Sequence, residues 1–428
     1  MNRALQGAGS RLHGPGAAPV TGRRIGLIDA LRGFALGGIL IVNLQSFLWG
    51  SGEPLGYFAH PPDAAEQGLF WLQAALVEGK FYPIFAFLFG VGFALQTRKL
   101  RRMCGADVLL AASAYRRRLA FLLLAGAAHG LLLYFGDILT SYALCGLLFF
   151  WTAPVRSRDL IAFARLWWAL AALSLLAPMG LDALLPSGDP LEAIPLSALE
   201  SRDIYAAAGY AAQLQRRGLD YAWQQFGGVA TLWPQLMALF TLGAIAGRLG
   251  WLRDPGRHPR VWLWAWRIGA GVGLPCALLG GWLHLVAIRE SPGDDAGVDG
   301  IVLGVSSLLA AAYVAAFARW HSRWQRIGPL RALLDGLAAA GRMPLTNYVL
   351  QSVVMGALFS GWGLGWGAAA SRAGLTAWAA VIYLAQIGFS RWYLIRAQQG
   401  PLEALWRRYT YRGLAGAGSS STRTQTPA

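Results

Sequence analysis

The chain has 428 residues, of which 56% are hydrophobic and only 14% are charged, and its formal net charge is +16. A charged fraction so far below the about 25% of soluble domains excludes an ordinary soluble protein. The positive charge falls in short clusters between long apolar runs, which excludes a nucleic-acid-binding surface and is typical of membrane orientation. The composition predicts an all-α, polytopic transmembrane helical bundle.

The organisation of the chain follows from where the apolar runs begin and end. Residues 1–24 are rich in Gly, Ala and Arg without an apolar core, and they predict a disordered cytoplasmic tail. Residues 25–397 form the predicted transmembrane domain, with a large external loop at 180–227. Residues 398–412 predict a cytoplasmic amphipathic segment, and the Ser/Thr-rich residues 413–428 a second disordered tail.

Apolar runs long enough to cross a bilayer predict about ten spans, because a helix rises about 1.5 Å per residue. In chain order they cover residues 25–49, 68–96, 119–135, 138–151, 160–179, 228–249, 261–288, 301–320, 341–359 and 375–395. Basic segments alternate with acidic or neutral segments at every crossing. The positive-inside rule therefore places both termini in the cytoplasm.

Several local patterns refine these spans. Glu78-Gly79-Lys80 interrupts the second region and predicts a lead-in helix near the interface, a break, and a span from Pro83. Pro275 predicts a kink in the seventh span. Residues 201–226 have aromatic and apolar side chains at helical spacing, which predicts a helix on the membrane surface. Residues 330–340 predict a further amphipathic stretch.

The cytoplasmic side gathers one group of polar residues. Asp29 and Arg32 are three residues apart, so they share a helix face and can pair. They act either as a helix cap and an anchor, or Arg32 binds phosphates of a nucleotide-bearing donor together with Arg98 and Arg342. The candidate substrate-binding residues on this side are Asp29, Asn347 and Gln351.

The outer side gathers the candidate catalytic residues His129, Asp137 and Asn43. A neutral imidazole inside a span can act as a general base, although His129 could equally be a packing residue. Asp137 could orient His129 or cap the fourth span, and Asn43 could join helices. No Gly-rich phosphate loop, Ser–His–Asp order or metal-ligand spacing stands out. The three cysteines are interpreted as packing residues.

Five motifs along the chain carry a resemblance to a known family. They are Ile25–Gly33 followed by Asn43, Phe85–Gly90, His129-Gly130 with Tyr134–Leu139, Gly341–Tyr348 and Gly400–Arg407. In this order they resemble the YeiB-like family of bacterial membrane proteins, a domain of unknown function numbered 418, over about residues 24–412. The resemblance implies a multi-pass protein of the bacterial cytoplasmic (inner) membrane.

A wider resemblance concerns the first span. With Asp29, Arg32-Gly33 and Asn43 it is similar to that of the membrane acyltransferase superfamily, which includes heparan-alpha-glucosaminide N-acetyltransferase. This similarity implies transfer of an acyl group from a cytoplasmic donor, with acyl-CoA as the candidate, to an external glycan or lipid acceptor. It assigns Asn43 to the site and Arg32 to the donor side. Those relatives have a histidine shortly before the second span, whereas residues 68–82 have none, so His129 would have to replace it.

Three hypotheses follow. In the first, the protein is an acyltransferase-like enzyme in which His129 is the base, Asp137 orients it and Asn43 holds the acceptor or the oxyanion. The alternative is a transporter or permease for a small or amphipathic solute, with Asp29 or Asp137 coupled to protons. The third is an envelope interaction protein that uses the loop 180–227 as its contact surface. The sequence leaves the oligomeric state open.

Overall fold

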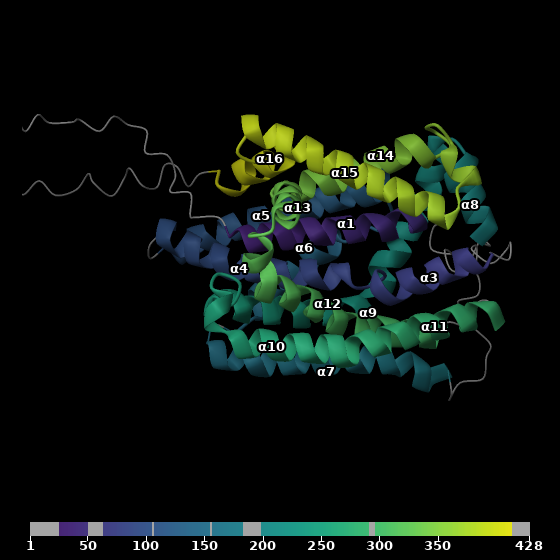
Figure 1. Ribbon diagram of the computed structural model, residues 1–428. Coiled ribbons are helices and arrows are strands. Elements are labelled where there is room, and N and C mark those ends of the chain that lie inside the picture. The colour runs from purple at the N-terminus through teal and green to yellow at the C-terminus, as the bar shows by residue number, and fades with distance from the viewer. Residues whose placement is uncertain are drawn as a thin grey trace, which may run out of the picture.

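The structure is a computed structural model, and it describes residues 25–49, 63–104, 107–154, 156–182, 198–290 and 296–412. Within these ranges the chain is helical and forms no strand. Most helices run roughly along one common direction, and α1 lies in the middle of the bundle (Figure 1). The predicted tails 1–24 and 413–428 lie outside the described residues.

The first half of the chain forms α1 Gly26–Trp49, α3 Ala64–Leu76, α4 Phe81–Cys104, α5 Val108–Leu132, α6 Leu139–Thr152, α7 Ser157–Asp182, α8 Ala198–Ala207 and α9 Tyr210–Leu249. The second half forms η2 Pro255–Arg257, α10 Pro259–Ile268, η3 Gly269–Gly273, α11 Leu274–Glu290, α12 Ala296–Trp324, α13 Gly328–Gly341, α14 Pro344–Phe359, η4 Trp366–Ala369, α15 Arg372–Arg396 and α16 Pro401–Thr410. The all-α prediction is confirmed.

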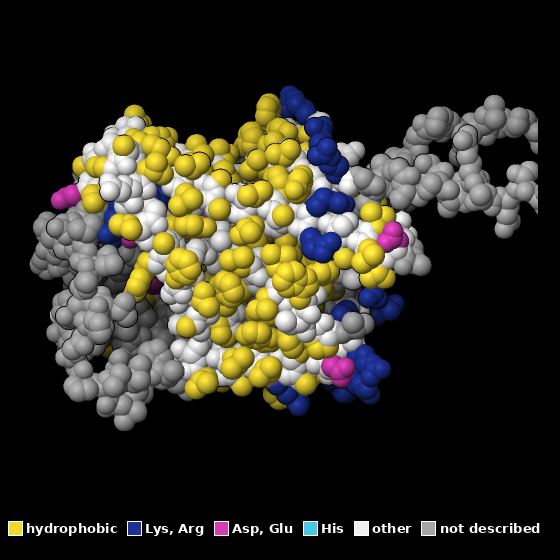
Figure 2. All heavy atoms as spheres, turned by 180° about the vertical axis from the view of Figure 1, so that it is seen from behind, with side chains coloured by type: hydrophobic (Ala, Val, Ile, Leu, Met, Phe, Trp, Pro, Cys, Tyr) yellow, Lys and Arg dark blue, Asp and Glu magenta, His cyan; other side chains and the backbone are white. Residues whose placement is uncertain are grey.

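Length, composition and surface together indicate a membrane protein. Among the described residues, five segments are long and apolar enough to cross a membrane: Gly26–Leu48, Ala64–Cys104, Tyr210–Leu249, Pro259–Ala287 and Arg372–Arg396. Figure 2 shows an apolar surface across the middle of the molecule, with Lys and Arg side chains gathered at one end. By this criterion five segments qualify, so the number of about ten crossings stays a prediction.

The basic end of the bundle is where the chain both begins and ends its described part. Arg98 near the end of α4 donates to the carbonyl oxygen of Arg248 near the end of α9, at 3.4 Å. Arg117 in α5 donates to the carbonyl oxygen of Thr410 in α16, at 3.3 Å. At the opposite end, Gln45 of α1 donates to the carbonyl oxygen of Arg372, the first residue of α15, at 3.3 Å. Helices α4 and α9 therefore end at the basic end, whereas α1 ends and α15 begins at the opposite end.

Glycines set the closest helix contacts. A Cβ built on Gly33 would lie 1.9 Å from the carbonyl oxygen of Leu337, and one on Gly341 1.9 Å from that of Asp29. The first turns of α1 thus pack directly on the backbone of α13. Gly90 of α4 and Gly243 of α9 make the same kind of contact, because small residues let helix backbones approach closely.

The structure contains both predicted helix irregularities, one near Gly79 and one near Pro275. Residues 77–80 separate α3 from α4, and Gly79 has a φ of 71°, a conformation that other residues rarely adopt. The irregularity of the seventh span lies at η3, a π-helical segment just before Pro275. Proline lacks an N–H and leaves the carbonyl four residues earlier unpaired, so the distortion appears one turn before Pro275 itself.

The helix predicted over residues 201–226 of the loop 180–227 is present, but it is divided and extended. Residues 183–197 lie outside the described residues, but 198–207 form α8, and residues 210–227 are the first half of the 40-residue helix α9. The sixth span and the segment predicted on the membrane surface are therefore one helix. It continues because its polar side chains, including Gln213 and Asp220, find buried partners within the bundle.

The contact of α1 with α13 can be tested with Gly341→Ala. We expect the added methyl group to lower the free energy of unfolding by about 3 kcal/mol, the upper end for overpacking, since it meets backbone that cannot rotate away. Thermal unfolding of the purified protein in detergent measures the change. The control is Gly388→Ala in α15, where nothing lies within 4 Å and the exchange should be neutral or stabilising. Equal effects of both variants would contradict the packing.

Candidate active site

His129 lies at the centre of a buried hydrogen-bonded group. Its Nδ1 is 2.9 Å from Oδ1 of Asp137, and its Nε2 is 2.8 Å from Oγ of Ser352. The three side chains come from α5, from the turn before α6 and from α14, and each residue is at most 2% exposed. We refer to Asp137, His129 and Ser352 as the His129 triad.

The turn between α5 and α6 fixes the carboxylate. Asp137 is eight residues after His129, and its Oδ2 accepts a hydrogen bond from the backbone N–H of Thr140 at 2.9 Å. The two roles predicted as alternatives for Asp137 therefore occur together: one oxygen contacts the imidazole, and the other caps α6. A side chain held at both oxygens has little freedom to turn away from His129.

The partners decide which nitrogen of the imidazole carries a proton. An ionised carboxylate only accepts hydrogen bonds, so Nδ1 of His129 is the donor toward Asp137. In the neutral ring, Nε2 is then the acceptor, and the Ser352 hydroxyl donates to it. This is the order of groups that activates a hydroxyl in acyl transfer, an acid orienting a base that faces a nucleophile.

Aromatic rings enclose the imidazole. The ring of Tyr348, one turn before Ser352 on α14, packs 4.7 Å from the His129 ring between centroids. Tyr134 contacts His129 edge to face at 6.3 Å, and its hydroxyl is 2.9 Å from Oγ of Ser46 on α1. Tyr134, which follows the end of α5, thus connects the His129 site to α1.

Asn43 is not joined to the His129 triad. It lies on α1 one turn before Ser46, is partly exposed, and makes no hydrogen bond within the part of the chain that the structure describes. Ser46 contacts Tyr134, so this part of α1 borders the site, and among the described residues no hydrogen bond joins Asn43 to His129 or Asp137.

The first half of α9 covers the triad, and the sequence did not reveal this. Tyr221 Oη is 2.8 Å from Oγ1 of Thr140. Gln225 donates to the backbone oxygen of Asp137 at 2.9 Å and accepts from Ser141 at 2.9 Å. The sequence predicts only that Tyr221 and Gln225 belong to a surface helix, because helical spacing is the one pattern visible around them.

A charged group holds α8 and α9 against the end of α5. Arg217 donates to the carbonyl oxygen of Leu132 in the last turn of α5, at 2.7 Å. Arg216 pairs with Asp220 at 2.9 Å, and Asp220 accepts from the Tyr205 hydroxyl at 2.6 Å. Burial raises the pKa of Tyr205, and the neighbouring Asp220 carboxylate raises it further. These contacts fix the segment that covers the triad.

The candidate donor side keeps two of its three predicted arginines together. Arg32 pairs with Asp29 at 3.1 Å, and Arg342 directly follows Gly341, which packs on Asp29. Arg98 instead contacts Arg248 between α4 and α9. Arg342 donates to the carbonyl oxygen of Gln398 at 3.2 Å.

A further cation at this end was missed by the sequence. Arg118 immediately precedes the predicted third span, where it was interpreted only as a basic loop residue. Burial, together with the positive charge of Arg32, lowers the pKa of Arg118 to about 10.

Asn347 and Gln351 hold helices together in the structure. The Asn347 amide donates to Ser390 at 2.9 Å and to the carbonyl oxygen of Ala340 at 3.0 Å. Gln351 donates to Gln386 at 3.0 Å, and Gln386 donates to the backbone of Asn347. These four residues form a polar seam between α14 and α15, which is the helix-joining role of buried amides in membranes.

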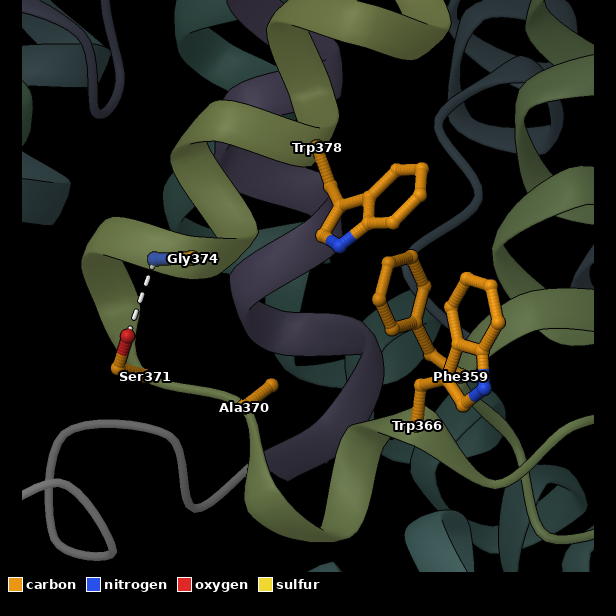
Figure 3. Close-up of a pocket in the computed structure, with 6 residues that line it drawn as sticks. All are labelled: Phe359, Trp366, Ala370, Ser371, Gly374 and Trp378. Atoms are coloured by element: carbon orange, nitrogen blue, oxygen red, sulfur yellow. Dashed lines mark hydrogen bonds between the residues drawn. The ribbon is translucent and has the colours of Figure 1, made fainter.

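A pocket opens between the end of α14 and the start of α15. It has a volume of about 380 Å³ and is lined by Phe359, Trp366, Ala370, Ser371, Gly374 and Trp378. Figure 3 shows the rings of Phe359, Trp366 and Trp378 grouped on one side, opposite Ser371 at the start of α15. Phe359 is seven residues beyond Ser352, two turns along the same face of α14.

Helix α16 joins the two helices that carry His129 and Ser352. The Glu403 carboxylate accepts from the backbone N–H groups of Leu345 and Thr346 at 2.7 and 3.1 Å, at the start of α14. Trp406 donates to the carbonyl oxygen of Arg118 in α5 at 2.8 Å, and the Arg118 guanidinium lies 3.8 Å from its ring centre. The carboxylate acts as a helix cap supplied by another element.

The cap can be tested with Glu403→Gln. We expect a loss of about 1–2 kcal/mol in the free energy of unfolding, because a neutral amide offers one acceptor oxygen and no charge to the start of α14. Thermal unfolding of the purified protein measures this loss. The control Arg408→Gln removes an exposed charge from the same helix and should leave the free energy of unfolding nearly unchanged. An unchanged Glu403→Gln protein would show that the cap contributes no stability.

Comparison with known proteins places the chain among bacterial relatives. Residues 246–413 match the family described as "Protein of unknown function (DUF418)". The chain is 28% identical over 413 residues to the uncharacterized protein YxaH of Bacillus subtilis strain 168, covering 92% of this chain and 95% of YxaH. It is 28% identical over 424 residues to the uncharacterized protein YeiB of Escherichia coli K12, covering 92% and 98%. No solved structure matches significantly.

A third relative shares a shorter region. An uncharacterized 39.9 kDa protein in the amylase 3′ region of Bacillus acidopullulyticus is 41% identical over 125 residues, which is 29% of this chain and 33% of that protein. The family match covers helices α10 to α16, including Ser352, and the two long alignments extend over most of the chain, α5 and α6 included. The chain is thus similar over most of its length to uncharacterised bacterial proteins that include YeiB, and its residues 246–413 match the DUF418 family.

Proposed function

We propose that the protein is a membrane acyltransferase-like enzyme in which His129 is the general base. The observation that carries the proposal is the position of the imidazole between the Asp137 carboxylate and the Ser352 hydroxyl, at 2.9 and 2.8 Å. Asp137 holds the ring in the tautomer that leaves Nε2 free to accept a proton. The Asp137 carboxylate also stabilises the imidazolium that forms when Nε2 accepts a proton.

The proposed topology has ten crossings, with both termini in the cytoplasm of a bacterial cell and the chain in its inner membrane. The gathering of Lys and Arg side chains at one end of the bundle supports it (Figure 2), since basic residues are generally enriched on the cytoplasmic side of membrane proteins. In this orientation His129 and Asp137 lie in the outer half of the membrane, because they close α5 and open α6 far from the basic end.

Donor and acceptor are assigned to opposite ends. Arg32, Arg118 and Arg342 at the basic end would hold the phosphates of a cytoplasmic acyl donor such as acyl-CoA. The aromatic pocket beside Phe359 and Trp378 would hold an envelope glycan or lipid acceptor, two turns outward from Ser352. The acyl chain would cross between them along the bundle, whose interior is apolar.

Transport of a small or amphipathic solute is the second candidate, and the buried Asp137–His129 pair favours it because such pairs can carry protons. Against it, Asn347 and Gln351 are engaged in the polar seam between α14 and α15. Uptake of labelled solutes into proteoliposomes, with no acyl transfer, would favour the transporter.

The role of His129 is tested by His129→Gln and His129→Asn, each of which keeps one hydrogen-bonding group but removes the base. We expect acyl transfer to fall about 10²–10⁴-fold, the usual contribution of a general base. The assay follows label from an acyl thioester into membrane glycans and lipids. The control His321→Gln changes a histidine in the last turn of α12 and should retain full transfer. Full transfer by both His129 variants would contradict the assignment.

The topology is tested by labelling single cysteines in spheroplasts, after the three native cysteines are replaced. We expect a membrane-impermeant maleimide to label Leu364→Cys, between α14 and α15, in intact spheroplasts. Gln325→Cys, just after α12, should react only after permeabilisation. Labelling of both positions from the same side would exclude the proposed orientation.

A further inference from the structure

The proton-accepting nitrogen of His129 already faces a hydroxyl of the chain itself. In a direct transfer, the acceptor hydroxyl would have to occupy the place beside Nε2. That place is taken by Oγ of Ser352, at 2.8 Å, and Ser352 is 1% exposed. Ser352 is 223 positions after His129 in the sequence and lies on a different helix.

The hydrogen bond of Ser352 leads to a candidate base, whereas several other hydroxyls in these helices bond to their own helix. Serine and threonine inside helices usually donate to a backbone carbonyl one turn earlier. Ser46, Thr97 and Thr241 do so, at 3.1, 2.8 and 2.7 Å. Within the described residues, the hydrogen bond of Ser352 is to His129 alone. Its hydroxyl is thus directed at the base and away from its own helix.

We propose that Ser352 is the nucleophile of a two-step transfer and carries the acyl group as an ester. This inference rests on the proposed function and adds a covalent intermediate to it. The donor is an acyl thioester, the leaving group is its thiol, and the acceptor is a hydroxyl or amine on the outer side. A direct, single-step transfer with His129 as base is the alternative that the experiment below distinguishes.

Each of the two steps forms one bond to the acyl carbon and breaks another. In the first, Ser352 Oγ attacks the thioester carbonyl while Nε2 of His129 takes the hydroxyl proton; the C–S bond breaks, and the thiolate leaves with that proton. In the second, the acceptor hydroxyl attacks the serine ester while Nε2 takes its proton. The ester C–O bond to Oγ breaks, and the proton returns to Ser352. Asp137 stays ionised in both steps and holds the ring.

The surroundings suit this role. Tyr348 packs on the imidazole from the same helix as Ser352, so the base and the nucleophile share one rigid support. Glu403 fixes the start of α14, and Trp406 fixes α5 to the same short helix. The separation of Oγ and Nε2 is therefore set by helix packing and does not depend on a loop.

The experiment uses the purified full-length protein in liposomes, with acetyl-coenzyme A and p-nitrophenyl acetate as acyl donors and no acceptor. After acid quenching, mass spectrometry of peptides locates any acetyl ester. We expect an adduct on Ser352 in the native protein and at least about 100-fold slower adduct formation in His129→Gln. Ser352→Ala should lose the adduct, while Ser352→Cys should form the corresponding thioester. Ser113→Ala, whose hydroxyl bonds to its own helix, is the control and should keep the ester.

The outcomes separate this inference from the proposed function. Acyl transfer by the native protein without an adduct on Ser352, and with full transfer by Ser352→Ala, overturns the inference and leaves the transferase standing. Neither transfer nor adduct with either donor overturns both. The native protein and the Ser352→Cys protein give an answer even if Ser352→Ala does not fold.

Discussion

The hydrogen bonds of one buried imidazole tie the functional part of this structure together. His129 contacts Asp137 on one side and Ser352 on the other, so α5, α6 and α14 meet at a single ring. Burying three polar side chains costs free energy unless each is paired, and here the carboxylate, both ring nitrogens and the hydroxyl all have partners. A group satisfied in this way has one arrangement, because any rotation leaves a buried polar atom unpaired.

Contacts at both ends of the bundle hold the helices that carry the His129 triad in place. At the basic end, α16 caps α14 through Glu403 and holds α5 through Trp406, while Gly33 and Gly341 bring α1 and α13 into backbone contact. At the other end, the start of α9 covers the triad through Tyr221 and Gln225. The cations of the basic end and the aromatic pocket beside Phe359 then lie on opposite sides of one fixed centre.

The sequence predicted what depends on local pattern. Apolar runs located the helices, and His129 and Asp137 could be paired because only one short turn separates them. Ser352 could not be found, since nothing local distinguishes it from other helical serines and its partner is 223 residues away. Asn43 was grouped with the site by resemblance, but its helix presents Ser46 to Tyr134 instead. The sequence predicts a surface segment for the first half of α9, because its charges find buried partners only after folding.

The protonation of His129 is the property on which this account depends most. Solid-state NMR of the protein in lipid, with ¹⁵N-labelled histidine, distinguishes protonated from unprotonated ring nitrogens, and comparison with His129→Gln assigns the signals among the six histidines. We predict a proton on Nδ1 toward Asp137 and an unprotonated Nε2 that accepts from Ser352. A proton on Nε2 at neutral pH would leave no base facing the hydroxyl and would contradict the proposed chemistry.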